Sequence, residues 1–456
     1  MSSTTAQRTS ESSWLVLALA CACQFVVILD SSIVNVALPS IQRDLGFTAT
    51  GLAWVVNGYL LTFAGFMLLG GRAADLFGRR RMLIAGLSLF AAASLVAGLA
   101  TTPQILVAAR LAQGIGAAVL APATLAVINT GFVEERSRAR AFGAWSAAGG
   151  VGGMAGALAG GAITTGLSWR WVFLINVPIG AVLIAVAVWS LAGTVTGRRE
   201  SLDLAGALTG TAGLGGLIYG VMHGADHGWS SVQVLGPVAA GVLLLAGFVA
   251  VQARTVRPMM PLRLFGIRRV AVGNLMLVLF GGIAIAMWYF TSLFLQNVLG
   301  YSAFGAGLGQ TPAAVVFLLI ARWAAALLPR TGVRPLILTG SACFLAGFGW
   351  LAQAGAHTEY ATGVLGPTLL IAIGIGLTFP TLMAAATADA PERDAGIIGG
   401  MAATANQVGG SVGLAVLATV AGTANAYDHV FAVAAGLGVI IAAVGMLLPR
   451  RGGPVA

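Results

Sequence analysis

One segment of the chain reads Gln24-Phe-Val-Val-Ile-Leu-Asp30-Ser-Ser-Ile-Val-Asn35-Val-Ala-Leu-Pro-Ser-Ile41. It lies in an apolar run that begins at Trp14 and exceeds the roughly 20 residues that a membrane-spanning helix needs. An aspartate inside such a helix costs a few kcal/mol to insert, so it seldom lies there without a role. Because a helix turns by about 100° per residue, four polar side chains of this segment share an arc of about 140° and are expected to face protein or water. They are Gln24, Asp30, Ser31 and Asn35.

The composition is that of an integral membrane protein. Of the 456 residues, 58% are hydrophobic and 8% are charged, whereas soluble proteins have about 25% charged residues. The net charge of +10 comes from arginines in short loops between apolar runs, which is typical of membrane topology rather than of a nucleic-acid-binding surface. The three cysteines all lie inside apolar runs, which argues against a disulfide framework and against a metal site.

Fourteen apolar runs are long enough to span a bilayer, and no soluble domain fits between them. They begin near Trp14, Leu52, Met82, Gln104, Ala139, Val172, Asp203, Gln233, Val270, Ala303, Pro335, Thr362, Gly396 and His429. Arginine is concentrated in alternate loops, and the positive-inside rule assigns these loops to the cytoplasm. With an even number of spans, both termini are expected to be cytoplasmic.

A weak internal repeat divides the chain into two halves. The loops at residues 71–81 and 329–334 each lie one span after the start of a six-span block. Related helical halves around a midplane site are typical of transporters. The predicted organisation is a tail at 1–13, a six-helix bundle at 14–193, two inserted helices at 194–253, an interfacial linker at 254–269, a second six-helix bundle at 270–448 and a tail at 449–456.

Arg110 in the fourth span lies at a depth similar to that of Asp30. A single buried charge is very costly while a pair is tolerable, so these two residues are predicted to pair. Two interpretations remain open, namely a static ion pair that locks spans 1 and 4 and a pair that works in transport. Gln113 and Gly114 share the helical face of Arg110, as in a cavity wall.

The fifth span contains a run of glycines spaced four residues apart. Gly152, Gly156 and Gly160 repeat the G-x-x-x-G pattern, and Gly161 follows them. Missing side chains let another helix backbone approach closely. Alone, the pattern indicates only tight packing.

The loop between spans 2 and 3 has a sharper pattern. Gly71 and Gly78 allow a tight turn. Its arginines, which include Arg72, Arg79 and Arg80, hold the loop inside. Asp75 is an acid among these bases, and topology alone does not explain it. The loop is therefore predicted to act as a gating loop.

Together, these stretches resemble the major facilitator superfamily and, within it, the fourteen-helix drug:proton antiporters of the multidrug and quaternary-ammonium exporter type. The stretches that carry the resemblance are Leu29-Asp30-Ser-Ser-Ile-Val-Asn35-Val-Ala-Leu-Pro39, Gly71-Arg-Ala-Ala-Asp75-Leu-Phe-Gly78-Arg-Arg80, Arg110-Leu-Ala-Gln113-Gly114-Ile-Gly116, the glycine run 152–161, Trp169-Arg-Trp-Val-Phe-Leu-Ile-Asn176-Val-Pro178 and Ser292-Leu-Phe-Leu-Gln296-Asn-Val-Leu-Gly300-Tyr-Ser302. The chain departs from the family pattern at Ala157, where the antiporter motif usually has proline, and at Asn406, where arginine is commoner.

The resemblance implies an all-α integral membrane protein with the major facilitator fold, built of two six-helix bundles and two inserted helices. It implies a transporter of the bacterial plasma membrane, not an enzyme, that works by alternating access. The expected partners are a small amphipathic organic substrate, protons and the lipid bilayer, without nucleic acid. The chain is expected to be monomeric, with the proton gradient as its energy source and no cofactor.

Asp30 is the best candidate for the proton carrier, because it is the one acid that falls within the hydrocarbon region away from the inner ends of the spans. A nearby Arg110 opposes its protonation, so the separation or solvation of the pair is expected to change between states. A single carrier predicts a low proton stoichiometry and neutral or monocationic substrates. The candidate cavity residues are Gln24, Asn35, Asn57, Gln113, Trp288, Tyr289 and Phe379. For the aromatic ones, packing or lipid contact is the alternative.

Four functions are compared at this point. The first is proton-coupled efflux of drugs or antibiotics. The alternative within the same class is a facilitator or proton symporter for uptake of a small metabolite, which an inward substrate flux would identify. A membrane sensor or scaffold is disfavoured because no soluble domain is present, and an enzyme because no nucleophile–base or metal set lies at membrane depth.

Overall fold

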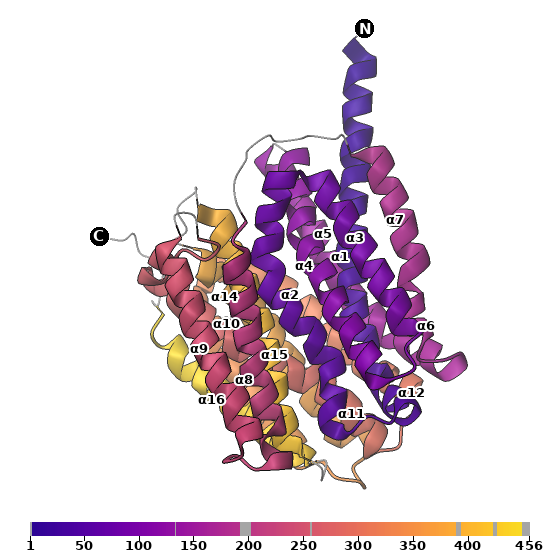
Figure 1. The fold of residues 1–456 in the computed structure, drawn as a ribbon, viewed down its shortest axis with the longest axis vertical. Coiled ribbons are helices and arrows are strands. Elements are labelled where there is room, and N and C mark those ends of the chain that lie inside the picture. The colour runs from indigo at the N-terminus through magenta and orange to yellow at the C-terminus, as the bar shows by residue number, and fades with distance from the viewer. Residues whose placement is uncertain are drawn as a thin grey trace.

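The computed structural model describes residues 2–132, 134–191, 202–255, 258–388, 394–422 and 426–448. The predicted tail at 449–456 and the predicted boundary between residues 193 and 194 lie outside these residues. The described part is all helical, without a strand (Figure 1). The predicted all-α fold is therefore confirmed.

The first half of the chain forms a bundle that ends before residue 192. Its elements are α1 (Ser2–Leu45), α2 (Ala49–Phe77), α3 (Arg79–Gly98), α4 (Pro103–Gly131), α5 (Glu135–Gly166), α6 (Trp171–Leu174) and α7 (Asn176–Ser190), the last two forming one span. Threonine side chains cap the first turns of two of these helices. The Thr48 hydroxyl accepts from the Gly51 amide at the start of α2. The Thr102 hydroxyl accepts from the Ile105 amide at the start of α4, where Pro103 is the first helical residue.

The remaining elements form an inserted pair and a second bundle. The pair is α8 (Leu204–His227) and α9 (Val232–Arg254). After the short helix η1 (Leu262–Gly266), the second bundle contains α10 (Arg268–Ile285), η2 (Ala286–Phe290), α11 (Thr291–Asn297), α12 (Ala303–Thr331), α13 (Val333–Leu351), η3 (Ala361–Leu365), α14 (Gly366–Thr387), α15 (Ala395–Ala421) and α16 (Tyr427–Gly445).

Thirteen helical segments of the described chain are long and apolar enough to cross a membrane. The one remaining predicted span, which begins near Gly396, is α15, a helix of 27 residues that packs between α10 and α2. Its Asn406-Gln407 pair and its glycines lower the hydropathy of the middle of the helix. Because these residues face neighbouring helices in a bundle, a lower hydropathy is compatible with a membrane-embedded position.

The turns after the second helix of each bundle are alike. Gly78 joins α2 to α3 with φ of +90°, and Gly332 joins α12 to α13 with φ of +79°. Both values lie in the region that residues with a side chain rarely adopt, so glycine is required at both turns. The two loops that suggested an internal repeat thus share the same turn, in which a glycine with positive φ joins two helices.

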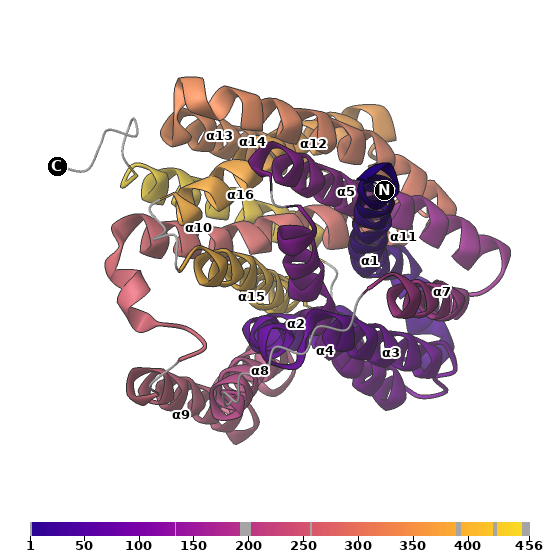
Figure 2. The ribbon, with the colours of Figure 1, turned by 90° about the horizontal axis from the view of Figure 1, so that it is seen from above.

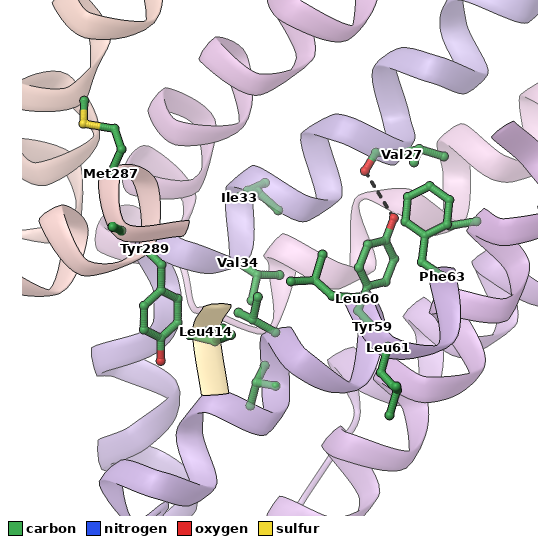
Figure 3. Packing of buried hydrophobic residues seen from close by; sticks show 14 of the residues in the cluster. Val27, Ile33, Val34, Tyr59, Leu60, Leu61, Phe63, Met287, Tyr289 and Leu414 are labelled. Carbon is green, nitrogen blue, oxygen red and sulfur yellow. Dashed lines mark hydrogen bonds between the residues drawn. The ribbon is translucent and has the colours of Figure 1, made fainter. Parts of the chain in front are cut away.

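The two bundles meet mainly along two helix pairs, α2 with α15 and α5 with α12, and α1 also contacts the second bundle. The inserted helix α8 packs against both α2 and α15, and α9 packs on α8 at the side of the molecule (Figure 2). The hydrophobic core is continuous across the junction. Figure 3 shows Ile33 and Val34 of α1 and Leu60 of α2 near Tyr289 of η2 and Leu414 of α15.

The linker between the inserted pair and the second bundle packs on protein. Leu264 of η1 is buried in a small cluster with Ile398 and Met401 of α15. Arg263 beside it donates two hydrogen bonds to Asp394, at 3.0 and 2.8 Å. The hydrogen bonds to Asp394 raise the pKa of the Arg263 guanidinium above its usual value.

The glycine run of α5 lets α1 approach to backbone contact. A methyl group built on Gly152, Gly156 or Gly160 would lie 2.6, 2.8 or 2.7 Å from the carbonyl oxygen of Phe25, Leu29 or Ile33, respectively. Such distances are too short for a side chain, which is why each position is glycine. The Ser32 hydroxyl also donates to the Gly153 carbonyl at 2.7 Å.

The opposite face of α5 packs as closely on α12 of the second bundle. A methyl group on Gly161 would lie 2.6 Å from the Phe304 Cα atom, and one on Gly307 would lie 2.2 Å from the Ala157 carbonyl oxygen. Ala157, the position at which the family motif has proline, therefore lies in the contact between the two bundles. One helix thus joins α1 to the second half of the molecule.

Replacement of Gly161 by alanine is expected to force α5 away from α12 and to lower the free energy of unfolding by about 1–3 kcal/mol. A fall in the Tm of the purified protein in detergent would measure this loss. Gly166→Ala at the end of the same helix is the matched control, because a methyl group there meets nothing within 4 Å. Equal Tm values for the two variants would contradict the close contact.

Candidate functional site

Asp30 and Arg110 form an ion pair in the interior of the first bundle. The Arg110 Nη1 atom lies 2.6 Å from Asp30 Oδ2, and both residues are 0% exposed. The pair joins the middle of α1 to the first part of α4. Because neither charge reaches solvent, the pair depends on its other hydrogen bonds to offset the cost of desolvation.

Gln113, one turn after Arg110 on α4, links the two charges. Its Oε1 atom accepts from Arg110 Nη1 at 2.7 Å, and its Nε2 atom donates to Asp30 Oδ1 at 2.7 Å. The second hydrogen of Nε2 goes to the Ser94 hydroxyl of α3 at 2.8 Å. All hydrogen-bonding groups of this amide are therefore used.

The rest of the Arg110 guanidinium is also surrounded by favourable groups. Its Nε atom donates to the Val55 carbonyl of α2 at 2.8 Å. The ring of Tyr59 lies under it at 4.3 Å, and the ring of Phe173 at 5.8 Å. A cation over an aromatic face is stabilised most where water is excluded, as it is here.

Two members of the site carry no clear signal in the sequence. Asn176, the first residue of α7, donates from Nδ2 to Asp30 Oδ1 at 2.7 Å. Ser94 donates to the Phe90 carbonyl at 2.7 Å while accepting from Gln113. Asn176 lies in a stretch that resembles the family in helix 6, so that stretch could have led to it, whereas a lone serine in an apolar helix is not distinctive.

Most of the other predicted cavity residues lie away from Asp30. Gln24 is half-buried against Gly149 of α5. Asn57 accepts a hydrogen bond from Ser411 of α15 and contacts the Met222 sulfur of α8 at 3.5 Å. It therefore lies where α2, α8 and α15 meet. Of the predicted set, Gln113 is the one in direct contact with the ion pair.

The aromatic candidates belong to the second bundle. Trp288 and Tyr289 lie in η2, a π-helical turn between α10 and α11, and Phe379 of α14 stacks on Phe280 at 5.5 Å between ring centroids. Gln310 of α12 donates to the Trp288 carbonyl at 3.3 Å. Single π-helical turns are frequent at functional sites, because they re-aim side chains.

The C-terminal part of α1 is bound to the second bundle just beyond Asp30. The Ser292 hydroxyl donates to the Asn35 carbonyl at 3.3 Å, and Gln296 Nε2 donates to the Val36 carbonyl at 3.1 Å. Within the described part of the chain, the Asn35 side-chain oxygen is buried without a hydrogen-bond partner. The helix that carries Asp30 therefore contacts both bundles.

The predicted gating loop lies at the other end of α2. Gly71 packs against Pro122 of α4, and Arg80 donates to the Val188 carbonyl of α7 at 2.6 Å. Asp75 is exposed, while Arg72 and Arg79 are half-buried. This loop contacts the first bundle at two helices other than its own.

The comparisons with known proteins agree with this arrangement. Residues 20–414 match the sequence profile of the Major Facilitator Superfamily. The chain belongs to this superfamily. It is 43% identical over 443 residues to the cephamycin export protein of Amycolatopsis lactamdurans, covering 95% of this chain and 91% of the relative. It is 39% identical over 426 residues to the puromycin resistance protein of Streptomyces alboniger, covering 91% and 84%.

Further relatives and solved structures extend the same conclusion. The lincomycin resistance protein of Streptomyces lincolnensis is 33% identical, with 90% of this chain and 85% of the relative covered. A D-xylose-proton symporter of known structure superposes with a TM-score of 0.72 over 97% of this chain and 99% of that chain, at 14% identity, which shows the shared fold alone. This major facilitator protein is therefore a multi-pass transporter of the bacterial plasma membrane and not an enzyme, as its sequence predicts.

Arg110→Leu is expected to lower the free energy of unfolding by about 3–5 kcal/mol, because it leaves the Asp30 carboxylate buried without its cation. Adding Asp30→Asn should recover part of that loss, since it removes the unpaired charge. A double-mutant cycle of thermal unfolding measures the coupling between the two residues. Losses that simply add would show that the two side chains do not interact.

Proposed function

We propose that this transporter exports amphipathic drugs or antibiotics in exchange for protons, and that Asp30 carries the proton. The observation that supports this most directly is a fully buried carboxylate held by Arg110 among apolar helices. Among the described residues the other buried acid is Asp394, at the start of α15 beside Arg263 of the linker. Ionisable groups in a membrane interior are costly and usually functional.

The substrate class follows from the relatives. One is named for export of cephamycin, and two are named for resistance to puromycin and lincomycin. Small amphipathic organic molecules are therefore the expected cargo. The polar stripe of α1 and the aromatic residues of η2 and α14 are the proposed lining of the central cavity.

Arg110 determines when Asp30 can bind a proton. The Arg110 guanidinium lies 2.6 Å from the Asp30 carboxylate, and in this arrangement the two side chains form an ion pair. Uptake of a proton on the outside requires that Arg110 withdraws or becomes solvated, and release on the inside requires that the pair forms again. Arg110 keeps Val55, Gln113 and the Tyr59 ring as partners when Asp30 is neutral.

The contacts of α1 provide a route from this site to the motion of the bundles. Ser292 and Gln296 of α11 bind carbonyl groups of α1 one to two turns beyond Asp30. The glycine face of α5 holds α1 at backbone contact on its other side. When the bundles rock during alternating access, α11 moves relative to α5, and α1 between them is displaced.

The proposed topology places both termini in the cytoplasm, as the arginine-rich loops predict. The protein acts as a monomer, and the proton gradient is its energy source without a further cofactor. One proton that moves down about 100 mV supplies about 2.3 kcal/mol. At about 1.36 kcal/mol per tenfold step, this supports roughly a 50-fold gradient of a neutral substrate.

Asp30→Asn is expected to abolish proton-driven efflux and leave the protein folded, because the asparagine amide has the same shape as the carboxyl group but does not take up and release a proton near neutral pH. Drug susceptibility of an efflux-deficient host, together with efflux from proteoliposomes under a proton gradient, measures the loss. Asp44→Asn is the matched control, since Asp44 lies on the same helix, is exposed and pairs with Arg170 at the surface. Full active efflux by Asp30→Asn would refute the proposal, and proton-driven substrate uptake by the unaltered protein would identify a symporter instead.

A single carrier predicts exchange of one proton for each substrate molecule. Neutral and monocationic compounds should therefore be exported well, and dicationic compounds poorly, because no second buried acid is available in the described membrane spans. Stoichiometry from the substrate gradient sustained at known pH and voltage differences would measure this. A value of two protons per substrate would contradict the single-carrier mechanism.

A further inference from the structure

The hydrogen bonds of Asp30 leave it no acceptor for a proton of its own. Its Oδ2 atom faces Arg110, and its Oδ1 atom accepts from both Gln113 and Asn176. Among the described residues, every hydrogen-bond partner of the carboxylate is thus an N–H donor. A neutral carboxylic acid carries an O–H donor, which needs an acceptor when it is buried. At least one neighbour must change its orientation when Asp30 is protonated.

Gln113 is fixed in its present orientation. A half-turn of its amide would replace the oxygen that accepts from Arg110 by an N–H group, leaving two donors opposed. It would also point an oxygen at Ser94, whose only hydrogen is already donated to the Phe90 carbonyl. Turning Gln113 therefore loses several hydrogen bonds at once.

Asn176 has no such constraint. Its Nδ2 atom donates to Asp30, while its Oδ1 atom is buried and has no hydrogen-bond partner in the described part of the chain. A buried amide oxygen without a partner is costly and calls for an explanation. A half-turn of this amide loses no hydrogen bond except the one that the proton itself removes.

We propose that Asn176 is the proton-responsive positioning residue of the transporter: its side-chain amide turns over when Asp30 takes up a proton, so that its carbonyl oxygen accepts the Asp30 hydroxyl. The inference rests on the proposed role of Asp30 as proton carrier. The proton comes from water on the outer side and binds to Oδ1. The proton leaves to water on the inner side, and no covalent bond other than this O–H bond is made or broken.

In the part of the chain that the structure describes, the other groups around Asp30 do not offer a free amide oxygen of this kind. The charged or titratable groups that face it are Arg110 from α4 and Tyr59 from α2. The Tyr59 hydroxyl donates to the Val27 carbonyl oxygen at 3.5 Å. The groups from α3 and α7 are the neutral Ser94 and Asn176, and α5 presents glycines to this part of α1. Asn176 is therefore the neighbour that can become an acceptor at the lowest cost.

Infrared difference spectroscopy on the full chain in lipid vesicles tests the proposal. Protein labelled with ¹³C in the side-chain amide carbon of asparagine is titrated with acid, and the carbonyl band of protonated Asp30 is assigned by its loss in Asp30→Asn. We expect an isotope-sensitive asparagine amide band that changes together with the Asp30 band and is absent in Asn176→Leu. Glutamine labelled in the same way is the matched control and should give no such change.

Each outcome decides between the alternatives. An Asp30 band without an asparagine change, or with a glutamine change instead, would overturn the role of Asn176 and leave Asp30 as the proton carrier. The absence of any Asp30 band across the pH range of transport would refute the proposed function itself. In proteoliposomes, Asn176→Leu should reduce proton-driven efflux about tenfold or more, because protonated Asp30 then lacks its acceptor. Unreduced efflux by this variant would overturn the proposal even if Asp30 titrates.

Discussion

The structure depends on one buried ion pair. Charges in a membrane interior are tolerated only when their hydrogen-bonding groups are satisfied, and here five helices contribute to that end. The carboxylate of α1 receives donors from α4 and α7, and the guanidinium of α4 is held by a carbonyl and a ring of α2. Ser94 of α3 completes the set through Gln113. The first bundle is therefore arranged around a single charge whose state the transport cycle is proposed to change.

The glycine face of α5 connects this site to the other bundle. Because glycine has no side chain, α5 contacts α1 on one face and α12 on the other at backbone distance. A rigid contact of this kind transmits small displacements, since neither side has a flexible side chain to absorb them. Ala157, at the position where the family motif has proline, lies in the α5–α12 contact, and its carbonyl oxygen approaches Gly307 directly.

The inserted pair has a structural place that its sequence does not reveal. Helix α8 lies beside α2 and α15, where Asn57 is bonded to Ser411 and where Thr419 donates to the Val221 carbonyl at 3.0 Å. It thus covers one of the two seams between the bundles, whereas the other seam is formed by α5 and α12. The linker that follows returns to α15 through Arg263 and Leu264.

The membrane class, the helical spans and the pairing of Asp30 with Arg110 could all be predicted from the residues alone. These follow from local properties, namely hydropathy over about 20 residues and the high cost of a lone buried charge. Other features became visible only in the folded chain. Asn176 and Ser94 join the hydrogen-bond network of the Asp30–Arg110 ion pair. Asn57 lies between α2 and α15, where the two bundles meet, and Gln24 lies against α5. A polar side chain in an apolar helix indicates that a hydrogen-bond partner is needed. Which partner it meets depends on the rotation and separation of helices that are distant in the chain, and helix packing sets both.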